Sequence, residues 1–251
     1  MTKVLIWGIN GKMGLTIAET AIRLKDIKIV GGFDSLSADN FCHTYKVFDD
    51  PNNINVDYDV IIDFSHASAI NNIVIATEKK PRPVVIASTG HDAQEQKKIA
   101  ALAKKVPVFL SGNMSVGVNV LCRLVKQAAN ILYGWDVEVI EKHHNQKSDA
   151  PSGTAKMLVD SVNEGLSTPR LTTHGRCGQA KRSPHEIGVH AVRGGTIIGE
   201  HDVIFAGAEE LITLSHSAQS RKIFALGAFR AAKFLVDKKP KIYNMDDMFG
   251  I

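Results

Sequence analysis

The chain has 251 residues, of which 44% are hydrophobic, enough to form one large or two modest buried cores. Its 30 basic and 26 acidic residues give a net charge of +4, which is too balanced for a dedicated nucleic-acid-binding protein. Three widely spaced cysteines (Cys42, Cys122 and Cys177) argue against a disulfide framework and, with no secretory signal or apolar run of about 18 residues, predict a cytoplasmic protein that binds no membrane.

The amino-terminal segment has the order strand, glycine turn, helix. The apolar run from Lys3 to Trp7 leads directly into the turn Gly8-Ile-Asn-Gly11-Lys-Met-Gly14, and apolar residues recur at helical spacing after it. In a dinucleotide site such glycines permit the tight turn, the approach of the backbone to a pyrophosphate and close packing of the helix on the strand. Asn10 stands where glycine is commoner, but Asn tolerates left-handed backbone, which keeps the turn feasible. The alternative is a glycine turn with a structural role only.

A second feature of dinucleotide sites is an acidic residue that follows the turn by about 20 residues and binds the ribose hydroxyls. Asp34, at the end of the apolar run 28–33, fits this position. Further apolar runs at 58–64, 84–87 and 108–111 alternate with helical patterns after Gly14, His66 and His91. This alternation predicts an α/β fold with a Rossmann-like, doubly wound parallel sheet.

The pattern changes beyond residues 111–117. A helical stripe over 121–132 precedes a polar loop, a second helix and strand-like runs at 187–193, 196–206 and 210–216, which favours an α+β domain with a mixed sheet. Residues 167–186 show no convincing period and predict a long loop. A last helix over 220–237 is expected to pack on the first domain. The predicted domains are 1–114 with 217–251, for dinucleotide binding, and 115–216, for substrate binding and oligomerisation.

The segment 138–155, Glu-Val-Ile-Glu-Lys-His-His-Asn-Gln-Lys-Ser-Asp-Ala-Pro-Ser-Gly-Thr-Ala, predicts a site for an anionic substrate. It joins a strand to a helix, and Ser152 or Thr154 can cap that helix. Backbone N–H groups near Gly153 would then point outward with the helix dipole behind them, which attracts carboxylate or phosphate. Lys147 and His144 add further donors, which leaves one histidine for proton transfer.

These motifs resemble the 4-hydroxy-tetrahydrodipicolinate reductase (dihydrodipicolinate reductase) family of bacterial and plant lysine synthesis. Residues 141–155 are similar to the family's signature almost letter for letter, and the order of the other motifs extends the resemblance over nearly the whole chain. These other motifs are the turn 8–14, Asp63-Phe64-Ser65, Ser88-Thr89-Gly90, Asn113 to Asn119, Val192-Arg193 and Gly199-Glu-His201.

The resemblance implies NADH- or NADPH-dependent reduction of a small cyclic dicarboxylate, with loss of water, to tetrahydrodipicolinate. It implies proton-transfer roles for His143 and Lys147, and substrate contacts for His144, Ser152, Gly153 and Thr154. It also implies a cofactor site formed by Gly8, Ile9, Asn10, Gly11, Lys12, Met13, Asp34, Ala87, Ser88, Thr89, Ser111, Gly112, Asn113 and Met114. Members of the family are commonly homotetramers built through the sheet of the second domain, so a homotetramer is expected.

Two positions depart from the family pattern. Members that use NADPH well often carry an arginine just after the acidic residue, whereas this chain has Ser35. Asp34 would repel a 2′-phosphate without a neighbouring arginine, so a preference for NADH is predicted, tempered by Lys12. Ala87 stands where the family more often has glycine, which affects how closely the backbone can approach the cofactor.

Three alternatives fit parts of this sequence. His143, His144, His174 and Cys177 could in principle hold zinc, but they lack paired short spacings, so no metal site is predicted. A nicotinamide-sensing module without enzymatic activity would keep the glycine turn and Asp34, yet it has no need for Lys147. A different two-domain dehydrogenase, acting on an amino acid or semialdehyde, is the enzymatic alternative.

Four further histidines and one arginine favour structural interpretations. His43, His66 and His91 are expected at loop ends or helix starts, with structural or solvent roles. The strand setting of Arg193 and His201 suits either packing or subunit contacts.

Overall fold

The computed structural model describes residues 1–35 and 44–250. Cys42 and His43, and the expectations attached to them, lie outside the described residues. The chain divides into two compact units: unit 1 is Met1–Ser115 with Arg221–Ile251, and unit 2 is Val116–Ser220. The expected junctions were 114/115 and 216/217, and the function assigned to each unit remains a prediction.

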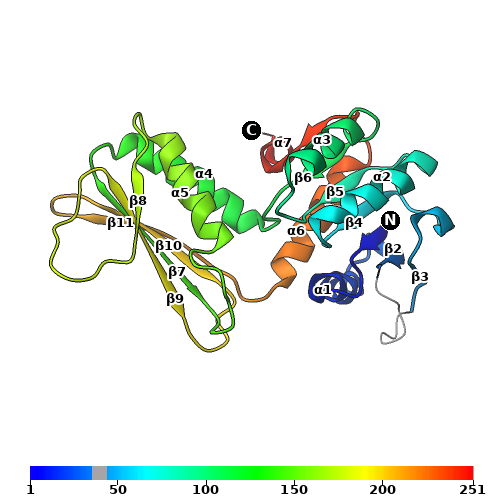
Figure 1. The fold of residues 1–251 in the computed structure, drawn as a ribbon, viewed down its shortest axis with the longest axis horizontal. Coiled ribbons are helices and arrows are strands. Elements are labelled where there is room, and N and C mark those ends of the chain that lie inside the picture. The colour runs from blue at the N-terminus through cyan, green and yellow to red at the C-terminus, as the bar shows by residue number, and fades with distance from the viewer. Residues whose placement is uncertain (36–43, 251) are drawn as a thin grey trace. The chain divides into compact units, whose positions relative to one another are not determined.

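Unit 1 is built on a seven-stranded sheet with the order β12-β6-β5-β4-β1-β2-β3, in which every strand pair is parallel (Figure 1). The strands are β1 (Thr2–Trp7), β2 (Ile27–Phe33), β3 (Val47–Phe48), β4 (Val60–Asp63), β5 (Val84–Ile86), β6 (Val108–Leu110) and β12 (Ile242–Tyr243). The helices are α1 (Lys12–Ala21), α2 (Ile70–Lys79), α3 (Ala93–Leu102), α6 (Lys222–Leu235) and α7 (Met245–Phe249), with short 3₁₀ turns η2 (Pro51–Asn53) and η3 (Ala67–Ala69).

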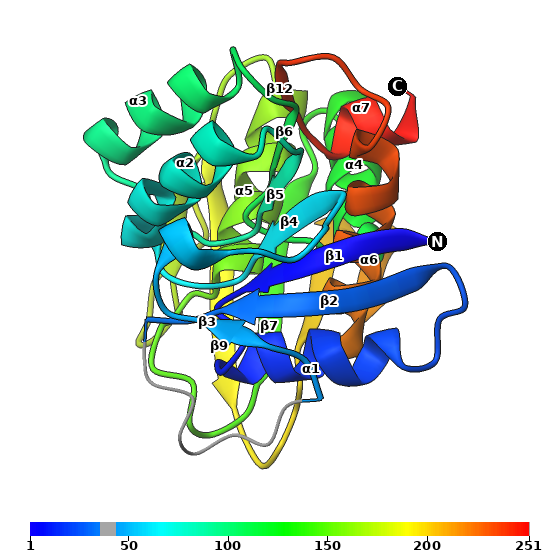
Figure 2. The same cartoon turned by 90° about the vertical axis from the view of Figure 1, so that its right-hand side faces the viewer.

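Helices cover both faces of this sheet. Figure 2 shows α1 and α6 on one side and α2 and α3 on the other. Along β1, Val4 and Ile6 join the core that contains α1 and α6, whereas Leu5 and Trp7 join the core that contains α2 and α3. A strand buried on both faces is apolar throughout, which is why β1 reads as a continuous apolar run. The predicted doubly wound fold is confirmed.

Unit 2 contains a five-stranded mixed sheet with the order β11-β10-β7-β9-β8. Its strands are β7 (Asp136–His143), β8 (Leu171–His174), β9 (Glu186–Arg193), β10 (Glu200–Ala206) and β11 (Leu211–Ser217), and its helices are α4 (Val116–Ile131) and α5 (Gly153–Gly165). Strands β7, β8 and β9 run parallel, and β10 is antiparallel to β7 and β11. Alternate residues of β7 are buried, and Val137 and Val139 pack with residues of α4 and α5. The predicted second α+β domain with a mixed sheet is therefore present.

Several short elements were not predicted. Residues 167–186, expected to be a loop, contain β8, so the loop prediction is wrong for Leu171–His174. This strand lies at a sheet edge and only Thr173 is partly buried, which leaves no hydrophobic alternation in the sequence. Strands β3 and β12 have two residues each, too few to show a period.

Across the described residues, no helix is both long enough and apolar enough to span a membrane.

Candidate active site

The residues predicted to bind the cofactor follow the carboxyl ends of parallel strands in unit 1. The glycine turn follows β1, Asp34 follows β2, residues 87–89 follow β5, and residues 111–114 follow β6. Because these strands are parallel within one sheet, their carboxyl ends lie along one edge, and the strand order changes direction between β1 and β4. Doubly wound proteins bind nucleotides at this position, so the geometry fits a dinucleotide.

The glycine turn packs tightly against its surroundings. Gly8 has a φ of +78°, a conformation that side chains rarely adopt. A Cβ atom on Gly14 would lie 2.2 Å from the carbonyl oxygen of Gly8, so no side chain fits between α1 and the turn. Gly11 is the N-cap of α1 and no side chain caps the helix, which leaves its first turn open to an anion.

Asn10 is held differently from the expectation. In the parts of the chain that the structure describes, only glycines have a positive φ, so Asn10 is not left-handed. Instead, its backbone amide donates a hydrogen bond to Asp34 Oδ2 at 3.0 Å. This bond ties the turn after β1 to the end of β2 and places the acidic residue beside the turn.

A buried carboxylate connects two loops at the same sheet edge. Asp63, at the end of β4, is 1% exposed and accepts hydrogen bonds from the backbone amide and the hydroxyl of Ser65. Its other oxygen accepts the Ser88 hydroxyl at 2.5 Å, and Ser88 Oγ lies 3.3 Å from His91 Nε2. Burial raises the pKa of Asp63, against the opposing effect of the hydrogen bonds from Ser65 and Ser88. The sequence motifs contain Asp63, Ser65 and Ser88 but do not reveal the contacts between them.

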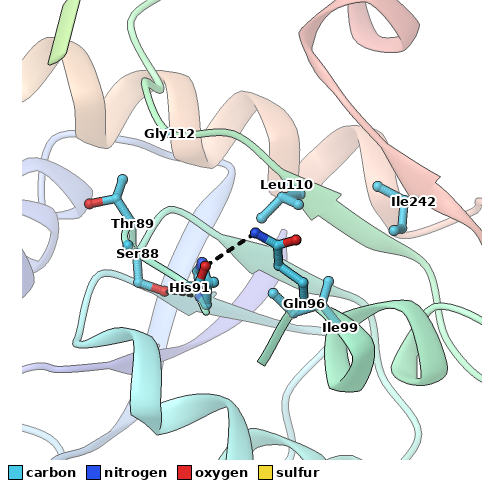
Figure 3. A pocket seen from close by; sticks show the side chains of 9 residues that line it. Ser88, Thr89, His91, Gln96, Ile99, Leu110, Gly112 and Ile242 are labelled. Carbon is cyan, nitrogen blue, oxygen red and sulfur yellow. Dashed lines mark hydrogen bonds between the residues drawn. The ribbon is translucent and has the colours of Figure 1, made fainter. Parts of the chain in front are cut away.

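A cavity of about 460 Å³ lies beside this network. Its lining includes three of the predicted cofactor residues, Ser88, Thr89 and Gly112, and Figure 3 shows His91 between Ser88 and Gln96 in its wall. The full lining is Ser88, Thr89, Gly90, His91, Gln96, Ile99, Leu110, Gly112 and Ile242. All of these residues belong to unit 1.

The predicted anion site of unit 2 lies where β7 ends and α5 begins. Ser152 is the N-cap of α5, and its buried hydroxyl accepts a hydrogen bond from the Ala155 amide at 3.2 Å. Gly153 is exposed, and a Cβ atom added to it would meet nothing within 4 Å. A ligand can therefore approach the first turn of α5 closely, as expected for a carboxylate-binding helix end.

Glu141 is the centre of the hydrogen bonds around this helix end. Its side chain is fully buried, yet it accepts four hydrogen bonds. The donors are His143 Nδ1 at 2.6 Å, the Ser152 amide at 3.0 Å and two guanidinium nitrogens of Arg193, each at 2.8 Å. Arg193 also donates to the Asp149 carbonyl at 2.6 Å. These bonds join β7, β9 and the loop before α5.

The electrostatics of this cluster favour an ionised Glu141 and a neutral His143. Burial raises the pKa of Glu141, but hydrogen bonds from Arg193, His143 and the Ser152 amide outweigh it, so the pKa lies below its ordinary value. Burial lowers the pKa of His143, against the effect of its hydrogen bond to Glu141. An ionised carboxylate only accepts, so the contact with Glu141 favours the His143 tautomer that carries its hydrogen on Nδ1.

His201 lies on the next strand and faces the same cluster. Its ring is 5.2 Å from that of His143, edge to face, and its Nε2 is 3.1 Å from the Ser152 hydroxyl. Burial, followed by the nearby His143, lowers the pKa of His201 to about 4, so the ring is neutral at pH 7. Within the described ranges, its Nδ1 is buried without a hydrogen-bond partner.

Lys147 and His144 lie in the loop between β7 and α5. Lys147 Nζ is 2.7 Å from Asp149 Oδ1, and this lysine lowers the pKa of Asp149. The Lys147 side chain is 21% exposed, and His144 is half-buried. The loop that leads to the open end of α5 therefore contains a partly buried ammonium group, that of Lys147.

Three residues of this site were not assigned to it from the sequence. The sequence presents Glu141 only as part of a motif, and the strand setting of Arg193 and His201 suits packing or subunit contacts. Glu141 and His143 are two positions apart on β7 and so share one face of the strand, a signal that was present in the sequence. The pairing with Arg193, on β9, depends on the sheet register and leaves no local signal.

Two family models together cover nearly the whole chain. The model described as dihydrodipicolinate reductase, N-terminus, matches residues 2–114, and the one described as dihydrodipicolinate reductase, C-terminus, matches residues 117–249. A protein of Caldanaerobacter subterraneus subsp. tengcongensis named 4-hydroxy-tetrahydrodipicolinate reductase is 49% identical over 249 residues, 99% of this chain and 98% of that protein. A protein of Clostridium botulinum with the same name is 44% identical, over 100% of this chain and 99% of that protein.

A solved structure supports the fold. The dipicolinate-bound dihydrodipicolinate reductase from Paenisporosarcina sp. TG-14 has a TM-score of 0.81 at 24% identity, and the match covers 98% of each chain. Both halves of the sequence match the family, and full-length relatives share more than 40% of their residues with it. This chain therefore belongs to the dihydrodipicolinate reductase family.

Proposed function

We propose that this chain is an oxidoreductase that converts 4-hydroxy-tetrahydrodipicolinate to tetrahydrodipicolinate, with loss of water, in lysine and diaminopimelate biosynthesis. The observation that carries the proposal is the site at the start of α5. There an open helix end, the Lys147 ammonium and a buried neutral His143 occur together in a member of this family. Assembly as a homotetramer and a cytoplasmic location are further parts of the proposal.

The substrate is a ring with two carboxylates, and the α5 end suits one of them. Backbone amides of Gly153 and Thr154 bind a carboxylate, because Gly153 is exposed and the helix dipole favours an anion there. Ser152 holds the helix end in place through its cap, and His144 supplies a further donor. Lys147 adds a positive charge beside the same loop.

The sheet edge of unit 1 suits a nicotinamide dinucleotide. Residues 8–13 approach the pyrophosphate, Asp34 accepts hydrogen bonds from ribose hydroxyls, and residues 87–89 and 111–114 line the remainder of the site. The uncapped first turn of α1 and the bond between Asn10 and Asp34 support this assignment. A reduced nicotinamide, when bound, supplies the hydride.

Loss of water requires one base and one acid. At the α5 site, the neutral imidazole of His143 can act as the base and the ammonium group of Lys147 as the acid. His143 Nε2, which carries a lone pair, takes a proton from the ring carbon next to the hydroxyl-bearing carbon. The Lys147 ammonium gives a proton to the leaving hydroxyl, which departs as water. After hydride addition, the His143 imidazolium returns its proton to the same ring carbon, and Lys147 regains one from solvent. The substrate thus loses one water and gains one hydride and one proton.

NADH is proposed to be preferred over NADPH. Asp34 occupies the acidic position that would bind the ribose hydroxyls and would repel a 2′-phosphate, and Ser35 provides no compensating charge. Lys12, in the first turn of α1, offsets this only in part. We expect a higher kcat/KM with NADH when both cofactors are compared under one set of conditions. Equal or better efficiency with NADPH would contradict the preference.

The proton-transfer roles predict the effect of two substitutions. His143→Ala and Lys147→Ala should each lower kcat by about 100-fold or more, the usual scale for a general acid or base. Lys142→Ala is the matched control, since Lys142 lies on the opposite face of β7 and pairs with Glu200 and Asp202. Rates near wild type for either of the first two variants, in steady-state assays, would remove that residue from the mechanism.

A further inference from the structure

We propose that Glu141 is a positioning residue that holds His143 as the tautomer with its hydrogen on Nδ1 and its lone pair on Nε2. The inference rests on the proposed function, because the tautomer matters to catalysis only if His143 Nε2 exchanges a proton with substrate. Glu141 acts through His143 and needs no contact with substrate itself.

The geometry of β7 brings the two side chains together. Glu141 and His143 are both buried and lie on the same face of the strand, with 2.6 Å between Oε2 and Nδ1. The opposite ring nitrogen lies beside Gly199, where a Cβ atom would come within 3.0 Å of His143 Nε2. Glycine at this position therefore places no side chain against Nε2, while Nδ1 is held by Glu141.

The four donors around Glu141 require a carboxylate rather than an amide. One oxygen faces His143 Nδ1 and Arg193, and the other faces the Ser152 amide and Arg193. A glutamine has only one acceptor oxygen, so its NH₂ group would point at a donor in either orientation. If the NH₂ group faces the Ser152 amide, it meets two donors, that amide and Arg193. If it faces His143, it meets only one donor, Arg193, provided that the imidazole moves its hydrogen to Nε2. Glu141→Gln should therefore reverse the tautomer.

Charged groups from several elements surround His143. Glu141 on β7 forms an ion pair with Arg193 on β9 and a hydrogen bond with the imidazole. His201 on β10 packs edge to face against the ring, and Lys147 adds a positive charge from the loop. Arg193 balances the charge of Glu141 and fixes both carboxylate oxygens. The carboxylate can therefore stay ionised and orient the ring without drawing the proton away from it.

The test compares Glu141→Gln with wild type in kinetics and in histidine NMR. We expect kcat to fall at least about 100-fold, as when an amide replaces the carboxylate behind a catalytic histidine, with a smaller change in KM for the dicarboxylate. Nitrogen-15 shifts should show the hydrogen of His143 on Nδ1 in wild type and on Nε2 in the variant, the signal being assigned by its loss in His143→Gln.

Glu138→Gln is the matched control, because Glu138 lies on the other face of the same strand and pairs with Arg182 and His190. It should leave the His143 tautomer and kcat within about twofold of wild type. Retention of the Nδ1 hydrogen in Glu141→Gln, or an Nε2 hydrogen in wild type, would overturn the inference. If Glu141→Gln fails to fold, the wild-type spectrum alone still tests whether the His143 hydrogen is on Nδ1.

Failure of this inference is distinguishable from failure of the proposed function. A wild-type protein that reduces the substrate but has its His143 hydrogen on Nε2 would refute the role of Glu141 alone. A protein with the expected tautomer that does not turn over the substrate would refute the function alone.

Discussion

At the scale of single residues, the site depends on opposing effects on buried charges. Glu141 is fully buried, which by itself would favour the protonated acid, yet hydrogen bonds from three neighbours keep it ionised. For His143 the balance is the reverse, since burial outweighs the attraction of Glu141. An ionised Glu141 and a neutral His143 therefore lie two positions apart on β7.

The protonation state of His143 predicts the pH dependence of catalysis. Burial holds its pKa below the ordinary value of 6.5, so the imidazole is neutral at pH 7 and can act as a base. We expect kcat/KM to be level near pH 7 and to fall as the pH drops through the lowered pKa. His201, with a pKa of about 4, stays neutral across this range.

A pH profile distinguishes His143 acting first as a base from His143 acting first as an acid. If a His143 imidazolium were the initial proton donor, kcat/KM would rise as the pH drops toward its pKa. The profile should be measured for wild type and for His143→Ala, in which the acid-side fall should disappear. A fall that survives in His143→Ala would assign it to another group.

The sequence identified some of these residues and not others for a physical reason. His143, Lys147 and the Ser-Gly-Thr turn are contiguous, so one motif reveals them together. Arg193 is 52 positions from Glu141, and the two meet only because β7 and β9 pair in a given register. His201 reaches the cluster in the same way, through the pairing of β10 with β7.

At the scale of elements, the start of α5 is a capped helix end and, in the proposed function, also the binding site for a carboxylate. Ser152 caps the helix through the Ala155 amide and also contacts His201. The same amides that a cap leaves unsatisfied are those that a carboxylate would use. Stability and substrate affinity should therefore be linked at this helix and not at others.

Ser152→Ala tests that link. Loss of the cap should lower the free energy of unfolding by about 1 kcal/mol or somewhat more, and KM for the dicarboxylate should rise because the helix end is less well fixed. Asp92→Ala is the matched control, since Asp92 caps α3 of unit 1 in the same way. Asp92→Ala should lower the free energy of unfolding, measured in urea, by a similar amount and leave KM unchanged. An equal KM effect from both variants would mean that only overall stability matters.

The elements that the sequence predicted share a property that the others lack. Strand β1 is buried on both faces and appears as a continuous apolar run, whereas helix α6 buries one face and shows apolar residues at helical spacing, so burial leaves a recognisable pattern in both sequences. β8, with four residues and mostly exposed side chains, is placed by hydrogen bonds to β9 alone. Backbone pairing of that kind leaves no pattern in side-chain type.

At the scale of the whole molecule, the chain forms two compact units. Unit 1 is assembled from both ends of the chain, because α6 returns to pack against β4, β5 and β6. Unit 2 is continuous and contains the cluster around Glu141. This division agrees with one unit that binds a nucleotide and one that holds a dicarboxylate, as the proposed reaction requires.

The most direct measurement is oxidation of NADH or NADPH with 4-hydroxy-tetrahydrodipicolinate generated freshly by the synthase that precedes it. We predict that one equivalent of reduced cofactor is consumed for each tetrahydrodipicolinate formed, and that none is consumed when the synthase is omitted. The Caldanaerobacter relative provides a positive control. Folded protein that oxidises neither cofactor, while that relative is active in the same mixture, would contradict the proposed function.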